Sequence, residues 1–169
     1  ENFSTILEIG CFDKPLFRGN GVKYFEVLER DELVKRSAHA GRIDNTPEID
    51  YVNPTGSLEN INEKFEIVYS SHVIEHQFCL VRHLLETESI LTDDGYCIFT
   101  IPDKRYCFDY FIAESTIADV LDSYYNPLTN AHSLKSILEH RCLTTHSEPR
   151  EHWKGDHGTP GNGRKGREF

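Results

Sequence analysis

Several features that would place a sequence in a special class of protein are missing. There is no methionine, only one tryptophan, and no Cys-x-x-Cys pair among the five cysteines. No apolar run approaches the roughly 18 residues that span a membrane, and the first residues show no basic-then-apolar signal segment. Because the cysteines are scattered and odd in number, we expect free thiols in a reducing compartment, the cytoplasm. Since residue 1 is not methionine, we also expect a piece of a longer protein or a chain that lacks its first residues.

Basic residues are also fewer than acidic ones. The sequence has 18 Lys and Arg against 28 Asp and Glu, which gives a formal net charge of -10. A nucleic-acid-binding surface needs a basic face, so this balance argues against a nucleic acid as partner. The 169 residues suffice for one α/β domain with one hydrophobic core.

Short apolar runs, typical of buried strands, alternate with segments of helical periodicity. The runs predicted as strands are residues 4–9, 22–28, 49–52, 65–69 and 96–101. The predicted helices are residues 29–38, 58–62, 77–91, 115–125 and 131–141. Because parallel strands joined by helices follow right-handed crossovers, we expect a doubly wound, mainly parallel, Rossmann-like α/β sheet. Its expected strand order is 3-2-1-4-5, and strands beyond the fifth are not evident.

The side chains also predict which faces of the helices are buried and where the helices begin. The predicted inward residues are Leu80, Leu84 and Leu91 in one helix and Leu134, Ile137 and Leu138 in another. The predicted N-caps are Ser57 and Ser115, and residues 92–95 are predicted to form the turn before the fifth strand. We expect one domain over residues 1–143, followed by a polar segment over residues 144–169 that is mobile from residue 155.

Polar residues gather where predicted strands end. Open α/β sheets bind ligands in the crevice beyond the carboxyl ends of their strands, so these residues are candidates for a site. The densest group follows the fourth strand and comprises Ser70, Ser71, His72, Glu75 and His76. The charged residues behind Pro102, at the end of the fifth strand, form a second group.

Acidic residues close the first two strands. Glu8 is followed by Gly10, which would let the backbone approach a ligand while the carboxylate accepts its hydrogen bonds. Glu26 ends the second strand, where an acid in doubly wound sheets takes ribose hydroxyls. A Gly-x-Gly-x-x-Gly loop would need glycine where Phe12 and Pro15 stand, so a dinucleotide pyrophosphate site is not expected.

The group after the fourth strand also matches a metal pattern. His72, Glu75 and His76 have the spacing of the His-x-x-Glu-His zinc peptidases. That chemistry needs the motif inside a helix and a third ligand farther on. Because a buried strand runs straight into these residues, we assign no metal, although a divalent ion at this place is left open.

Together, these motifs resemble the class I S-adenosylmethionine-dependent methyltransferases over residues 6–110. The resemblance is carried by Leu7-Glu8-Ile9-Gly10-Cys11, Glu26, Ser71-His72-Val73-Ile74-Glu75-His76 and Leu91-Thr92-Asp93-Asp94-Gly95-Tyr96. Ile101-Pro102-Asp103-Lys104-Arg105-Tyr106 is similar to a subgroup often found beside glycosyltransferases in polysaccharide loci. The resemblance thus implies a longer protein that also carries a glycosyltransferase, and residues 144–169 as either a tail or a truncated acceptor-side segment.

The resemblance implies S-adenosyl-L-methionine as cofactor and a role for each matching residue. The cofactor-binding residues would be Glu8, Gly10, Cys11 and Phe12 at the methionine part, Glu26 at the ribose, Ser57 and Leu58 near the adenine, and Ser71 and His72 beside the reactive methyl group. His76 and His72 are the first candidates for a general base, because an imidazole titrates near neutral pH. Asp103 is the third candidate.

The acceptor is expected to be a small molecule or a sugar, methylated on oxygen. Phe12, which stands in place of a glycine of the common loop, favours an alternative. In that alternative the domain is catalytically degenerate and acts as a binding or scaffolding module of a larger protein.

Overall fold

The computed structural model describes residues 4–126 and 132–161. The chain divides into two compact units, Glu1–Ile101 (unit 1) and Pro102–Phe169 (unit 2), and each is described by itself. The domain boundary expected after residue 143 stays a prediction. Residue 131 of a predicted helix and residues 162–169 of the expected mobile segment lie outside the described residues.

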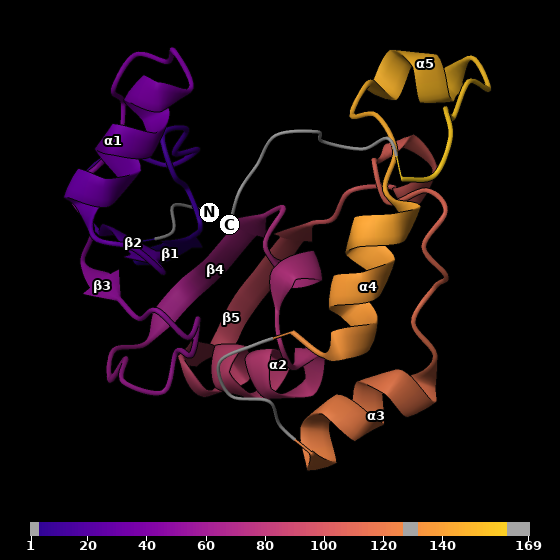
Figure 1. Ribbon diagram of the computed structural model, residues 1–169. Helices are drawn as coiled ribbons and strands as arrows, with labels where there is room; N and C mark the ends of the chain where they lie inside the picture. The colour runs from indigo at the N-terminus through magenta and orange to yellow at the C-terminus, as the bar shows by residue number, and fades with distance from the viewer. Residues whose placement is uncertain (1–3, 127–131, 162–169) are drawn as a thin grey trace. The chain divides into compact units, whose positions relative to one another are not determined.

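Unit 1 is built on a five-stranded sheet (Figure 1). Its strands are β1 (Ile6–Ile9), β2 (Val22–Glu26), β3 (Tyr51–Val52), β4 (Phe65–Ser71) and β5 (Leu91–Thr100). Every neighbouring pair is parallel, in the order β3-β2-β1-β4-β5. The predicted doubly wound fold and strand order are therefore confirmed.

The register brings the strand ends to one edge. Ile9 of β1 lies opposite Phe25 of β2 and Ser70 of β4. Glu26 and Ser71 each follow one residue later, so the ends of the three central strands meet at the same edge of the sheet. The chain reverses its winding direction between β1 and β4, which makes this edge a topological switch point.

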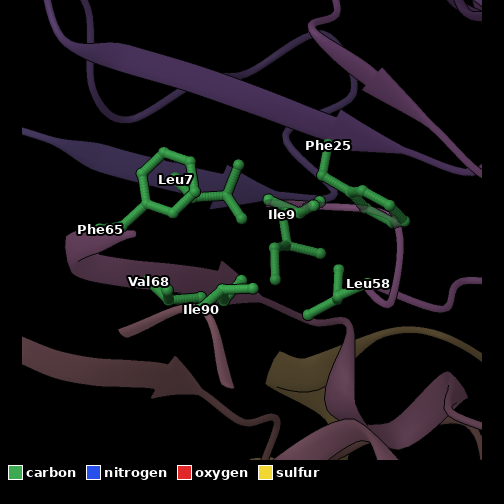
Figure 2. Packing of buried hydrophobic residues seen from close by; sticks show 8 residues of the cluster. Leu7, Ile9, Phe25, Leu58, Phe65, Val68 and Ile90 are labelled. Carbon is green, nitrogen blue, oxygen red and sulfur yellow. The ribbon is translucent and has the colours of Figure 1, made fainter. Parts of the chain in front are cut away.

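The core of unit 1 lies between these strands and the segments that cover them (Figure 2). Its buried residues include Leu7, Ile9, Phe25, Leu58, Phe65, Val68 and Ile90. Complete burial of one such side chain contributes about 1.5–3 kcal/mol. The central strands β1 and β4 are largely buried, as is typical of strands inside a parallel sheet, whereas Tyr96 and Ile98 of β5 are exposed.

Leu58 reaches this core from a loop, and the helix predicted over residues 58–62 does not form. The backbone N–H of Ile61 donates to the Leu58 carbonyl at 3.0 Å, which closes a turn. The Glu86 carboxylate accepts from the Ser57 hydroxyl at 3.1 Å and from the Leu58 N–H at 2.8 Å. Glu86 therefore anchors the loop, and Ser57 caps no helix.

The helices of unit 1 are α1 (Arg30–His39), the 3-10 turn η1 (Ile74–His76) and α2 (Leu80–Ser89). The helix predicted from residue 77 begins at Leu80, because the Cys79 sulfur caps it. Of the leucines predicted to face inward, Leu84 is exposed, Leu80 is half-buried, and Leu91 packs against the core from β5. The residues that α2 itself buries are His83 and Thr87. The His83 ring lies 6.1 Å from the Phe99 ring of β5, and burial lowers the pKa of His83.

Strand β5 begins five residues earlier than the predicted fifth strand. Leu91 already pairs with Phe65, and Tyr96 pairs with Ile67, so the ladder contains an irregularity between them. Residues 92–95, predicted as a turn, are absorbed into this part of the strand. The extra residues bulge out of the ladder, as β-bulges do near sheet ends.

Unit 2 contains η2 (Lys104–Tyr106), α3 (Ile117–Tyr125), α4 (Leu134–Leu143) and α5 (Pro149–Trp153). Helix α3 is capped by Thr116 instead of Ser115, because Thr116 and Asp119 form a reciprocal capping box. The residues predicted to face inward from α4, Leu134, Ile137 and Leu138, are exposed. Thr144, Thr145 and His152 are buried instead.

Membrane crossing was tested on residues 4–126 and 132–161. Within them, none of the helices combines the length and the apolar character needed to cross a bilayer.

Candidate functional site at the strand ends

Glu8, near the end of β1, is 2 % exposed. Its carboxylate accepts from the backbone N–H of Leu16 at 2.8 Å and from that of Phe17 at 3.0 Å. A buried carboxylate is tolerated when backbone donors satisfy it in this way. Glu8 therefore anchors the loop that follows β1, and contact with the methionine part of a cofactor stays a prediction for it.

Glu26, the last residue of β2, lies buried beside the same loop. Its Oε1 accepts from the Phe12 N–H at 2.6 Å. Burial raises the pKa of Glu26, the N–H groups of Phe12 and Val27 oppose this shift, and the nearby Glu8 carboxylate adds to it. The ends of β1 and β2 thus bring two buried carboxyl groups close enough to influence each other.

The backbone directly after β1 turns left-handed. Gly10 has φ 72° and Phe12 has φ 50°. A Cβ on Gly10 would collide with the Cγ2 of Val73, so this position requires glycine both for its dihedral angle and for its close approach to the chain after β4. Phe12 adopts a conformation that is rare for a bulky residue, and such strain concentrates at functional sites.

The neighbouring Cys11 is buried. Burial, together with the Glu26 and Glu8 carboxylates, raises the pKa of its thiol well above the ordinary range. A buried thiol whose pKa is raised is a weaker nucleophile than an ordinary cysteine.

A buried polar group that the sequence did not reveal supports the same loop. The Asp13 carboxylate, 4 % exposed, accepts from the Ser37 hydroxyl at 3.0 Å and from the Arg42 guanidinium at 3.2 Å. The Arg42 guanidinium also lies 5.7 Å from the centre of the Phe12 ring. No spacing in the sequence links residues this far apart, so only the fold brings them together.

The region predicted near the adenine lies in the loop after β3. Leu58 is fully buried, so its side chain belongs to the core, while Ser57 is half-buried. Contact of either residue with a cofactor stays a prediction.

The end of β4 differs in its exposure. Ser70 is buried, Ser71 is half-buried, and His72 takes a left-handed conformation with φ 57°. Glu75 lies between two imidazoles, with its Oε1 at 3.6 Å from the His72 Nδ1 and 4.0 Å from the His76 Nε2. The side chains of both histidines are more than half exposed.

Asp103, the third candidate base, belongs to unit 2. Its carboxylate accepts from the Arg105 side chain at 2.6 Å and from the Arg105 N–H at 3.0 Å. These bonds lower the pKa of Asp103, and a carboxylate of lowered pKa is a weaker proton acceptor. Its role stays a prediction.

Among the residues that the structure describes, no group of three or more His, Cys, Asp or Glu has an arrangement that could hold a metal ion.

Comparisons with known proteins give a likeness in structure but none in sequence family. The sequence matches no protein-family model and no curated protein. Among solved structures, the fold is similar to the crystal structure of the trans-methyltransferase CalH in complex with SAH. The match has 19 % sequence identity and a TM-score of 0.38, and it covers 57 % of this chain and 31 % of that one. The chain thus matches about a third of the length of that protein.

Proposed function

We propose that this chain binds S-adenosyl-L-methionine at the ends of β1 and β2 and transfers its methyl group to an acceptor. The observation that carries the proposal is the pair of buried carboxyl groups, Glu8 and Glu26, at adjacent strand ends beside the switch point of a parallel sheet. Nucleoside ligands of such sheets bind at this point, and an acid at the end of the second strand accepts their ribose hydroxyls.

Glu26 fits this role. An ionised carboxylate only accepts hydrogen bonds and has about four acceptor positions. The N–H groups of Phe12 and Val27 occupy two of them, so Glu26 retains capacity for two ribose hydroxyls. Because the Phe12 N–H fixes the carboxylate, Glu26 would bind the ribose without first losing its own side-chain freedom.

Glu8 and Gly10 would shape the methionine side of the site. Glu8 holds the loop through Leu16 and Phe17, and Gly10 lets the start of this loop approach Val73, in the chain after β4. Cys11 and Phe12 line the same loop, and Ser57 and Leu58 would support the adenine from the loop after β3.

The cofactor supplies a methyl group on a sulfonium, from which it is displaced in line by the acceptor atom. Ser71 and His72 would flank the place of transfer, and His76 or His72 would take the proton of an acceptor hydroxyl. Glu75 lies within ion-pair distance of both imidazoles, so it stabilises whichever of them becomes charged. The acceptor is proposed to be a small molecule or a sugar, on the strength of the resemblance of residues 101–106.

A second candidate function is a binding or scaffolding module without catalysis. Both oxygens of Glu8 already accept from the chain itself, and the Phe12 ring lies beside Arg42 where a smaller residue would leave the loop open. In this case the strand ends would be closed to a nucleoside.

Calorimetry with S-adenosylhomocysteine separates the two candidates. The methyltransferase predicts measurable binding that Glu26→Ala weakens by about 1–3 kcal/mol, the scale of leaving a polar partner unpaired. Asp94→Asn is the matched control, because Asp94 is an exposed acid of β5 at the opposite edge of the sheet, and it should leave the affinity unchanged. Absence of heat at high protein concentration would refute the enzyme and favour the module.

A further inference from the structure

Unit 2 contains a group of three histidines that the function proposed above does not use. His146, His152 and His157 come from the chain around α5, and we call them the histidine cluster. The His146 and His152 rings lie 4.3 Å apart, and the His152 and His157 rings 5.3 Å apart. Tyr110 stacks on His157 with ring centres 3.7 Å apart and an angle of 5° between the planes.

The hydrogen bonds of His152 fix the position of its proton. Its Nε2 lies 3.1 Å from the backbone carbonyl oxygen of His146. A carbonyl oxygen only accepts, so the Nε2 of His152 must carry the hydrogen. In a neutral imidazole the other nitrogen, Nδ1, is then an acceptor. His152 is 2 % exposed, so its ring and the two hydrogen bonds that it makes are shielded from solvent.

The state of His152 determines that of His157. The two Nδ1 atoms are 3.0 Å apart, which leaves room for one hydrogen between them. Because the His152 Nδ1 accepts, the His157 Nδ1 must donate. The neutral His157 ring therefore keeps an unprotonated Nε2, with its lone pair available. This is the arrangement in which a base histidine is oriented by a third group through its Nδ1–H.

The surroundings indicate where an added proton would go. A proton on the His152 Nδ1 would break the bond to His157 and place a charge in a buried ring, whereas a proton on the His157 Nε2 breaks no bond within the described cluster. The face of Tyr110 stabilises a positive charge stacked on it. Charged groups around these rings include Lys104, whose ammonium lies 5.8 Å from the Tyr110 ring centre, and Asp156, whose carboxylate accepts from the Gly158 N–H. The ion pair of Lys154 and Glu151 belongs to the same segment.

The backbone is built to hold this arrangement. The Thr145 hydroxyl donates to the His157 carbonyl at 2.7 Å, and Thr145 is itself buried. Gly158 has φ 64°, and a Cβ there would meet the Thr145 hydroxyl and the His146 ring. The orientation of His157 is thus fixed from both sides of the residue.

We propose that the unprotonated Nε2 of His157 is a proton-accepting site on unit 2, and that His152 is the residue that positions it. A proton taken up at this Nε2 would lie on the ring stacked against Tyr110. This role of His157 does not depend on methyl transfer by unit 1.

Long-range proton–nitrogen NMR on the full chain labelled with ¹⁵N-histidine reads the tautomers directly at neutral pH. We expect His157 as the Nδ1–H form and His152 as the Nε2–H form. His157 in the Nε2–H form, or His152 in the Nδ1–H form, would overturn the proposal without any variant having to fold.

Two variants test the positioning by His152. His152→Phe removes the acceptor and should convert His157 to the Nε2–H form, whereas His152→Asn offers an amide oxygen near the Nδ1 position and should restore the Nδ1–H signal. An unchanged His157 tautomer in His152→Phe would show that His152 does not position it. Failure of His152→Asn to restore the signal in a folded protein would count against the proposal in the same way.

Diethyl pyrocarbonate, which carbethoxylates an unprotonated imidazole nitrogen, tests whether the lone pair is available. Peptide mass mapping should find His157 modified and His152 unmodified, with exposed His39 as the internal reference. Modification of His152 before His157, or no modification of His157 while His39 reacts, would refute the proposal.

Discussion

The ends of β1 and β2 and the end of β4 all carry polar residues in the sequence, yet these residues differ in their burial and in their hydrogen bonds. Glu8 and Glu26 are buried and held by backbone N–H groups. His72 and His76 keep 62 % and 68 % of their side chains exposed and have only Glu75 within ion-pair distance. The first region is pre-organised, whereas the second is free to rearrange.

This difference suits the two regions to two tasks, holding a ligand and exchanging protons. A rigid pair of carboxyl groups can hold a ligand at little entropic cost. Exposed imidazoles can exchange protons with a group that binds next to them. Substitutions in the first region should therefore cost stability, and substitutions in the second should not.

The largest effect is expected at Gly10. Gly10→Ala imposes a side chain on a left-handed backbone and drives it into Val73, so the free energy of unfolding should fall by about 3 kcal/mol. Gly41→Ala is the matched control, because Gly41 has φ 68° but nothing within 4 Å of an added Cβ. In urea denaturation, Gly41→Ala should lower the free energy of unfolding by only about 1 kcal/mol. Equal costs for the two variants would show that the approach to Val73 does not matter.

A smaller loss is expected at Glu8. Glu8→Gln replaces one of the two acceptor oxygens with a donor facing the N–H groups of Leu16 and Phe17, which should lower the free energy of unfolding by about 2 kcal/mol. Urea denaturation of Glu8→Gln and Asp94→Asn, side by side, checks this result. If Glu8→Gln lowers the free energy of unfolding no more than Asp94→Asn does, Glu8 does not anchor the loop.

For a substitution at His72 we expect the free energy of unfolding to rise instead of fall. Its left-handed backbone costs about 1 kcal/mol, which glycine does not incur, so His72→Gly should raise the free energy of unfolding by up to about that amount. His76, at an ordinary backbone conformation, is the control, and His76→Gly should lower stability slightly. Destabilisation by both variants to the same extent would mean that the end of β4 is held as firmly as the ends of β1 and β2.

The smallest effect is expected in how the contribution of Glu26 to stability depends on pH. Burial raises the pKa of Glu26 above its ordinary value of 4.5, so its contribution to stability is complete below pH 4.5 and is lost as the pH rises through the folded-state pKa. Glu26→Gln cannot ionise and should not show this loss. The stability of the variant relative to the natural protein should therefore improve as the pH rises. A relative stability that falls with pH would mean that the folded protein favours the ionised carboxylate.

The sheet could be predicted because its signals are local. The apolar runs of β1, β2 and β4 and the acids that end the first two strands are visible in the sequence, and right-handed crossovers fix the order of the strands. The same signals located Glu8, Gly10 and Glu26 at one edge. The long fourth run even predicted the buried character of β4.

The errors arose where tertiary contacts override local pattern. Glu86 reaches across to anchor Ser57 and Leu58, so the chain there needs no helix to satisfy its N–H groups. The face of α2 that meets β5 carries His83 and Thr87, although the leucines on the same helix have the stronger apolar signal. Asp13 and Arg42 meet only after folding, so no spacing announced them.

Amide NMR during a titration with S-adenosylhomocysteine tests most directly whether the ends of β1 and β2 bind a nucleoside. The Phe12 N–H, which donates to Glu26, reports any ligand on that carboxylate. We predict that the Phe12 and Gly10 signals shift with the ligand, whereas those of Asp94 and Gly95, at the opposite edge of the sheet, do not. Shifts confined to other residues, or none at saturating ligand, would contradict this assignment of the site.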